Sequence, residues 1–172
     1  HFIILPICLT QMETHMAQQH YHPVSRYIHW LMAAIFIIAW AIGFYSTEFM
    51  TYGVDANKGS VITLHKNIAS TILFLVVIRI FWRYTHPAPQ LPDTMSAGMK
   101  KMAHFAHYVL YFLLLAIPIS GCIFSWSAGH PVPVLYSFEI PRLMAENKEL
   151  VKYARPVHEY LSLFEGLVVV GH

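Results

Sequence analysis

The stretch "YIHWLMAAIFIIAWAIGFY", residues 27–45, contains no lysine, arginine or carboxylate side chain. A helix needs roughly 20 mostly apolar residues to cross a bilayer core of about 30 Å. The stretch therefore predicts a membrane-spanning helix. It also places one histidine, His29, in an apolar setting, where a polar ring usually has a function.

Three more apolar segments lie downstream, at 61–82, at 103–124 and from Pro156 to His172. Proline suits the first turn of a helix, so we expect the fourth helix to begin near Arg155 and Pro156. It has only about 17 residues, fewer than a full crossing needs, so we expect the chain to be cut off within this helix. Apolar segments that alternate with polar or proline-rich links predict an all-α, transmembrane four-helix up-and-down bundle.

The composition also indicates a membrane protein. Hydrophobic residues make up 56% of the chain and charged residues 12%, against about a quarter charged in soluble domains. The net charge of +2 is too small to indicate nucleic-acid binding. Cys8 and Cys122 are too few for a disulfide framework, and the lack of a CxxCH motif excludes a covalently attached c-type haem.

The first residues differ from the rest of the chain. Residues 1–20 join a short apolar run to a polar one, without the basic start and cleavage site of a signal peptide. We expect a non-native or disordered leader there and one membrane domain over 21–172. The longest link, 127–153, has room for a short interfacial helix.

Four histidines fall at two depths of the predicted bundle. His29 begins the first helix on one side of the membrane, and His65 begins the second helix on the other side. His158 lies near the depth of His65, and His172 lies about 21 Å further along, which returns it to the depth of His29. The intervening residues turn through about 1400°, within roughly 40° of whole turns, so His158 and His172 share one face. Two facing pairs result: His65 with His158, and His29 with His172.

Each depth offers two imidazoles and no cysteine or carboxylate, and this set of ligands does not suit a tetrahedral zinc or Fe–S site. Bis-histidine ligation of haem iron needs only two trans imidazoles and leaves no open position, which suits electron transfer. A lone histidine in an apolar helix is as readily a hydrogen-bonded core residue, but four at two matched depths favour two stacked haems. Small residues serve ordinary helix packing and would also leave room for the flat ring; the candidates are Ala33, Ala34, Gly43, Ala69, Ser70, Gly166 and Gly171.

Several motifs resemble the bacterial cytochrome b561 family, a four-helix, quinone-linked, dihaem b-type membrane cytochrome. They match in order and spacing over about residues 21–172, and they are "HW" at 29–30, "LHKNIAS" at 64–70, "RIFWRYTHPAP" at 79–89, "MAHFAHYVLY" at 102–111, and "HEYL" with "GH" between 158 and 172. The resemblance implies two haem b groups in the bacterial inner membrane. His29 and His172 would hold the cytoplasmic-side haem, and His65 and His158 the periplasmic-side haem.

The resemblance also implies a reaction. An oxidoreductase similar to superoxide oxidase would take electrons from periplasmic superoxide and pass them to ubiquinone. The alternative is a haem b subunit that anchors a partner dehydrogenase or hydrogenase to the quinone pool. The short links favour the first, because docking a large partner needs more surface. A haem-free transporter is a third possibility. The N-terminus would be cytoplasmic, although lysines and arginines divide almost evenly between the two sides.

Arginines and histidines on the side of His29 form a second set of candidates. Arg79 and Arg83 are either interfacial anchors or contacts to haem propionates or a quinone headgroup, because arginine pairs bidentately with carboxylates. His104 and His107 are either interfacial or hydrogen-bonded to a propionate or quinone carbonyl. We do not expect these two to bind iron, and the sequence assigns no catalytic residue.

Basic residues also gather on the side of His65. Lys66, with Arg142, Lys148, Lys152 and Arg155, would form a cationic mouth. Such a field raises the arrival rate of a small anion such as superoxide. Nearby glutamates dilute this charge, so solubility and contact with lipid headgroups are the simpler explanation.

Glu165 departs from the family pattern, which tends to have a small or apolar residue at this position. It lies seven residues from both His158 and His172, so it shares their face. An intramembrane carboxylate indicates either a proton relay or a protonated acid hydrogen-bonded to a neighbour.

Overall fold

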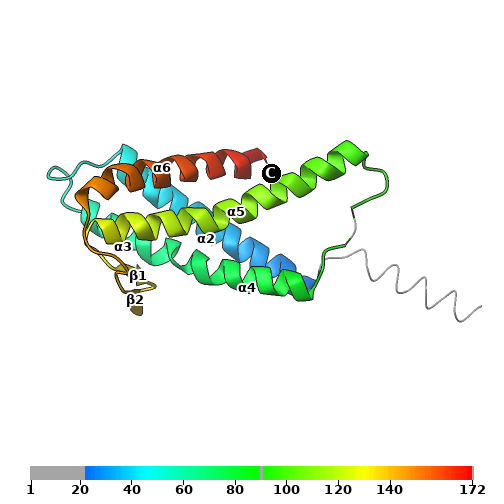
Figure 1. Cartoon of the computed structure of the whole chain (residues 1–172), viewed down its shortest axis with the longest axis horizontal. Helices are drawn as coiled ribbons and strands as arrows, with labels where there is room; N and C mark the ends of the chain where they lie inside the picture. Colours follow the sequence, from blue (N-terminus) through cyan, green and yellow to red (C-terminus); the bar gives the residue numbers. More distant parts are fainter. Residues whose placement is uncertain (1–21, 90, 172) are drawn as a thin grey trace, which may run out of the picture.

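The computed structural model describes residues 22–89 and 91–171, and these form a helical bundle with one small hairpin (Figure 1). The predicted all-α bundle is confirmed. The elements, in chain order, are α2 (Pro23–Glu48), α3 (Lys58–Ala69), α4 (Thr71–Thr85), α5 (Ala97–Ser127), β1 (Val132–Val134), β2 (Phe138–Ile140) and α6 (Lys148–Gly171).

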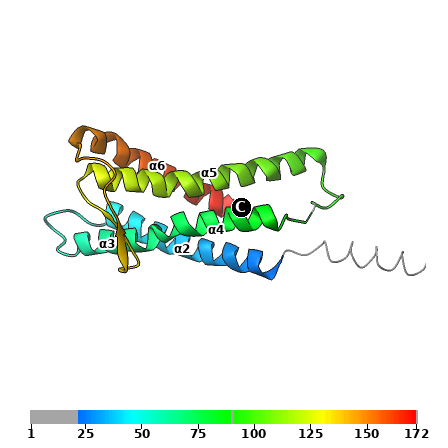
Figure 2. The ribbon, with the colours of Figure 1, turned by 60° about the horizontal axis from the view of Figure 1, so that its bottom comes forward.

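Three stretches of the described chain are long and apolar enough to cross a membrane: α2, the combined α3 and α4, and α5. Only 22%, 28% and 17% of their most apolar windows are buried inside the bundle, so most of their apolar side chains face outward. Lipid is the environment that such outward faces require. The fourth helix, α6, packs along α5 (Figure 2).

The second predicted span is one crossing made of two helices. Ser70 ends α3 and begins α4 with helical dihedral angles. The hydroxyls of Ser70 and Thr71 donate to the carbonyls of Asn67 (3.3 Å) and Ile68 (2.7 Å). Hydroxyl groups that bond back to the preceding turn bend a helix, which explains the interruption in an otherwise continuous span.

The prediction that Arg155 and Pro156 open the fourth helix is wrong, because α6 begins at Lys148 and Pro156 lies inside it. The start is set by Asn147, whose side-chain oxygen accepts a hydrogen bond from the backbone N–H of Leu150 at 3.0 Å. Asparagine is among the best residues at this capping position. The added turns carry Lys148 and Lys152, which the sequence placed in a link.

The link after α5 contains a hairpin where a short helix was considered. Strands β1 and β2 pair antiparallel, with Val134 opposite Phe138. The hairpin lies where α5 ends and α3 begins, and we call this the hairpin end of the bundle (Figure 2). The other end, where α4 runs into the proline-rich link 86–95, is the proline end.

The apolar core lies toward the proline end. Ile28, Met32 and Val76 are buried together, with Leu75, Trp82, Leu114 and Leu115 packed around them. Toward the hairpin end, two histidine rings occupy the space between the helices.

Candidate functional site

His65 of α3 and His158 of α6 face each other across the bundle. Their ring centres are 6.3 Å apart and the ring planes are inclined by 70°. Two imidazoles that bind one metal ion through bonds of about 2 Å can have ring centres about 6 Å apart. The structure therefore brings the rings of His65 and His158 together at a separation that would allow both to bind one metal ion.

Hydrogen bonds orient both rings. The Nδ1 of His65 lies 2.8 Å from the carbonyl oxygen of Ala39, and the Nδ1 of His158 lies 3.1 Å from that of Ile117. A carbonyl oxygen only accepts, so each Nδ1 carries the hydrogen and each Nε2 keeps its lone pair. Histidines that bind a metal commonly donate their other N–H in this way. Ser120 adds a second contact to the Nδ1 of His158, at 3.1 Å.

Both rings lie against glycines of the neighbouring helices. A Cβ atom added at Gly43 of α2 would come within 2.9 Å of the Cε1 of His65, and one added at Gly121 of α5 within 2.9 Å of the Cε1 of His158. Real Cβ atoms do not approach so closely. Gly43 was predicted to leave room for the flat haem ring, and the structure shows instead that it lies against the imidazole of His65; Gly121 was not predicted. The sequence feature that could have indicated Gly121 is a single glycine within an apolar helix, at about the depth of His158.

Three of the other predicted small residues, Gly166, Gly171 and Ser70, have other surroundings. Gly166 lies under the ring of Trp40, and a Cβ added at Gly171 would meet no atom within 4 Å. Ser70 forms the joint between α3 and α4. The room beside the histidine rings therefore depends on Gly43 and Gly121.

Across residues 22–89 and 91–171, no group of three or more histidine, cysteine or carboxylate side chains could hold a metal ion. A zinc or Fe–S centre needs such a group. A pair of imidazoles fits a metal that brings its remaining ligands with it, as the iron of haem does.

The second predicted pair is described only in part. His29 is half-buried in α2, with its ring centre 5.5 Å from that of Trp30. His172 lies outside the described residues, as does the predicted leader at 1–20. The pairing of His29 with His172 stays a prediction.

Arg79 is half-buried in α4. Its guanidinium carbon lies 5.8 Å from the ring centre of Tyr111, a cation–π contact. Its Nε atom is buried and has no hydrogen-bond partner among residues 22–89 and 91–171. A buried donor without a partner is costly, so Arg79 is suited to an acceptor such as a carboxylate or a carbonyl.

The other predicted residues of the proline end lie on α4 and α5. Arg83 is half-buried one turn further along α4. His104 is exposed and His107 half-buried, both in the first turns of α5. They lie at the same end as Arg79, which agrees with the predicted depth.

The predicted cationic mouth is partly neutralised. Lys152 pairs with Glu149 and Arg155 with Glu159, each at 2.8 Å. Lys66 is different, because its Nζ donates to the hydroxyl of Ser125 at 2.9 Å, and no carboxylate of the described chain lies within ion-pair distance.

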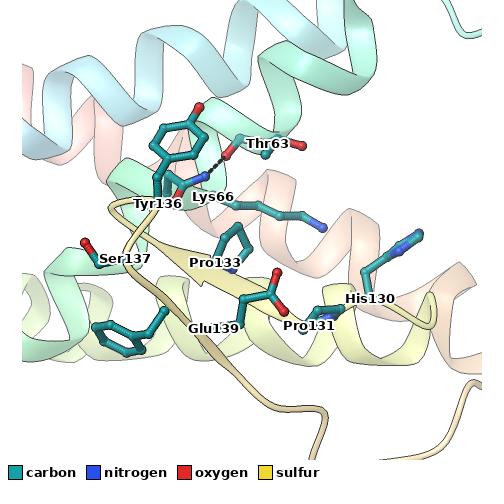
Figure 3. A pocket seen from close by; sticks show the side chains of 10 residues that line it. Thr63, Lys66, His130, Pro131, Pro133, Tyr136, Ser137 and Glu139 are labelled. Atoms are coloured by element: carbon teal, nitrogen blue, oxygen red, sulfur yellow. Dashed lines mark hydrogen bonds between the residues drawn. The ribbon is translucent and has the colours of Figure 1, made fainter.

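Lys66 also lines a surface pocket of about 460 Å³ at the hairpin end. His130, Tyr136 and Glu139 line the same pocket (Figure 3). The carboxylate of Glu139 lowers the positive potential that Lys66 creates in the pocket.

Glu165 is 2% exposed and lies within the bundle on α6. No hydrogen bond or ion pair to its carboxyl group occurs within residues 22–89 and 91–171. One turn away, the indole N–H of Trp40 donates to the carbonyl of Ser162 at 3.0 Å, which ties α2 to α6 beside this acid. Glu165 is thus a buried intramembrane carboxyl group, and the choice between a proton relay and a protonated acid stays open.

Known proteins are similar to this chain over most of its length. The family model for prokaryotic cytochrome b561 matches residues 20–172. Cytochrome b561 homolog 2 of Escherichia coli (strain K12) is 31% identical over 154 residues, which is 90% of this chain and 81% of that protein. The probable superoxide oxidase CybB of Yersinia pestis is 26% identical over 145 residues, 84% of this chain and 80% of that protein. Members of this family are bacterial membrane proteins that carry haem b and transfer electrons. With one matched pair of imidazoles inside a bundle of apolar helices, the chain belongs to the prokaryotic cytochrome b561 family.

Proposed function

We propose that this chain binds two haem b groups and transfers electrons from superoxide to ubiquinone. The facing pair of His65 and His158 carries the proposal, because the 6.3 Å between their ring centres suits two ligands of one iron. His29 and His172 would hold the second haem. Bound haem would supply a one-electron iron couple at each end of the bundle.

The chain orients the ligands at the hairpin end. The N–H groups on the Nδ1 atoms of His65 and His158 are engaged by backbone carbonyls of α2 and α5, so both Nε2 lone pairs are available to a metal. Gly43 and Gly121 let the rings lie close to these helices. Ligands whose orientation is fixed by the protein lose less entropy when they bind a cofactor.

The hairpin end would face the periplasm and receive the donor. Superoxide is a small anion, and the ammonium group of Lys66 would attract it. No carboxylate of the described chain forms an ion pair with this lysine, and Glu139 in the same pocket only lowers the positive potential. The name of the Yersinia pestis relative supports superoxide as the donor. Two superoxide anions and two protons would convert one quinone into quinol and release two dioxygen molecules.

The proline end would face the cytoplasm and receive the acceptor. The buried Nε of Arg79 needs an acceptor atom, which a haem propionate or a quinone carbonyl would supply. Arg83, His104 and His107 lie at this end and would add further donors near the same groups. The membrane in question would be the bacterial inner membrane.

Haem content tests the ligand assignment. Purified protein should hold about two haems per chain by the pyridine haemochrome assay, and His65→Ala and His158→Ala should each hold about one. The double variant should lose no more than either single variant, because the two residues share one haem. His130→Ala, an exposed histidine of the hairpin link, is the control and should keep both. A further loss in the double variant would contradict the pairing.

Activity tests the reaction. The isolated chain, in vesicles with ubiquinone, should form quinol when superoxide is generated outside. Full haem content without quinol formation would contradict the assignment of superoxide as the electron donor. If that chain also copurified with a dehydrogenase or hydrogenase, the role of an electron-transfer subunit would be favoured instead.

A further inference from the structure

The turn of the hairpin has an unusual backbone. Leu135 and Tyr136 both adopt positive φ angles, 48° and 56°, although neither is glycine. The left-handed region is unfavourable for residues with a side chain, and two consecutive cases persist only where the surrounding structure holds them.

Asn67 of α3 holds this turn. Its side-chain oxygen accepts the backbone N–H of Tyr136 at 2.6 Å, and its backbone carbonyl accepts the N–H of Leu135 at 3.2 Å. Its side-chain amide donates to the carbonyl of Thr63 at 2.9 Å, which fixes the rotamer. Asn67 is only 1% exposed. The left-handed turn thus points two consecutive N–H groups at one buried residue.

The hairpin also joins α3 to α5. On one side, the hydroxyl of Ser70 donates to the carbonyl of Pro133 at 2.9 Å. On the other side, the hydroxyl of Ser125 lies 3.1 Å from the carbonyl of His130, and it accepts from Lys66. Strand β1 packs against both helices. Its inward side chains, Val132 and Val134, are 5% and 3% exposed, so the strand fills the space between α3 and α5 at this end.

These two helices position the histidine pair. Helix α3 carries His65 two residues before Asn67, and α5 carries Gly121 and Ile117, which contact the ring of His158. A change in the spacing of α3 and α5 would therefore change how the two rings oppose each other. Figure 3 shows Thr63 and Lys66 of α3 beside Tyr136 and Ser137 of the hairpin, all of which line the pocket.

We propose that Asn67 is a positioning residue for the haem at the hairpin end, and that it acts through the hairpin. By capturing the turn at Leu135 and Tyr136, it locks β1 between α3 and α5 and fixes the distance between His65 and His158. The proposal rests on the proposed binding of haem by this pair.

The hydrogen bond between Asn67 and the hairpin turn, which we call the lock, can be removed by a substitution at Asn67 or at Tyr136. Asn67→Ala removes the side-chain acceptor of the Tyr136 N–H and keeps the backbone carbonyl that accepts from Leu135. Tyr136→Pro removes the N–H itself and forbids the positive φ angle. Tyr136→Gly keeps the N–H and adopts a positive φ without strain, so it should preserve the lock. Asn147→Ala removes the cap of α6 and leaves the turn untouched, which makes it the control for loss of an asparagine hydrogen bond.

Hydrogen exchange of the hairpin amides provides a readout that does not depend on haem. In Asn67→Ala the amides of the turn should exchange about tenfold faster or more, because a buried hydrogen-bond acceptor has been lost. Tyr136→Gly and Asn147→Ala should leave hairpin exchange within about twofold of wild type. Unchanged exchange in Asn67→Ala would overturn the role of Asn67 as the lock.

Redox titration and the low-spin EPR signal report on the haem. Asn67→Ala and Tyr136→Pro should shift the potential and the signal of one haem in the same direction, while the other haem stays as in wild type. A shift in Asn67→Ala alone would contradict action through the hairpin, because Asn67 is close in sequence to His65. Wild-type protein without a bis-histidine haem would instead overturn the proposed function. The unaffected second haem also shows that a variant has folded.

Discussion

At the scale of single residues, the absence of a side chain shapes the site. His65 and His158 rest on Gly43 and Gly121, and a methyl group at either glycine would overlap a ring carbon. If the rings moved away from these glycines, they would lose their hydrogen bonds to the carbonyl oxygens of Ala39 and Ile117. These glycines are therefore part of the site although they contribute no ligand.

Gly43→Ala should displace the ring of His65 and lower haem content from about two to about one per chain, since the new Cβ would lie within the closest allowed contact. The pyridine haemochrome assay measures this loss. Gly59→Ala is the matched control, because a Cβ there meets no atom within 4 Å. Equal haem content in the two variants would contradict a direct role of Gly43.

At the scale of elements, close approach of two helices depends on another glycine. Gly166 of α6 lies under Trp40 of α2, and a Cβ atom added at Gly166 would lie 3.1 Å from the indole ring. The indole N–H donates to the carbonyl of Ser162, on the same helix as Gly166. Membrane helices pack through such small residues and interhelical hydrogen bonds.

Gly166→Ala should displace the indole of Trp40 by a few tenths of an ångström and weaken its hydrogen bond to Ser162. The melting temperature should fall, at a cost of up to about 1 kcal/mol. Gly98→Ala, in α5, meets open space and should be neutral or stabilising by up to about 1 kcal/mol, since alanine favours a helix. Thermal unfolding in detergent, followed by circular dichroism, compares the two. A higher melting temperature for Gly166→Ala than for wild type would rule out this packing role.

The helices were largely predictable from the sequence, because each long apolar run is the signal of a membrane span. Their ends were less predictable. Pro156 suggested a start that the cap at Asn147 overrides, and the hydroxyls of Ser70 and Thr71 divide a span that has no break in hydropathy. Caps and back-bonded hydroxyls act through geometry, which a hydropathy pattern does not contain.

At the scale of the whole molecule, charge is distributed unevenly at the hairpin end. Lys152 and Arg155 are paired with glutamates, whereas Lys66 bonds to the neutral hydroxyl of Ser125. Lys66 is also next to His65 in the chain, so its charge contributes directly to the field near that ring. A field of this kind changes association rates and is screened by salt.

Lys66→Gln should lower the second-order rate constant for superoxide about threefold at low ionic strength, and the difference should vanish at high salt. This rate constant can be measured by mixing the protein with superoxide in a stopped-flow instrument, or by generating superoxide in a pulse, and following the reduction of the haem. Lys101→Gln, an exposed residue near the opposite end of α5, is the control and should react as wild type. A deficit in Lys66→Gln that persists at high salt would mean that the lysine acts by contact or structure.

The sequence by itself determined the membrane bundle and the common depth of His65 and His158, because hydropathy and helical rise are properties of consecutive residues. It also led to His65 and His158 as a pair, since antiparallel helices bring equal depths together. Only the tertiary structure decided that Gly121 supports one ring, that Lys66 bonds to a hydroxyl and not to a carboxylate of the described chain, and that Asn67 captures a left-handed turn about seventy residues away. These features depend on contacts between segments distant in the chain, and such contacts are set by packing in three dimensions.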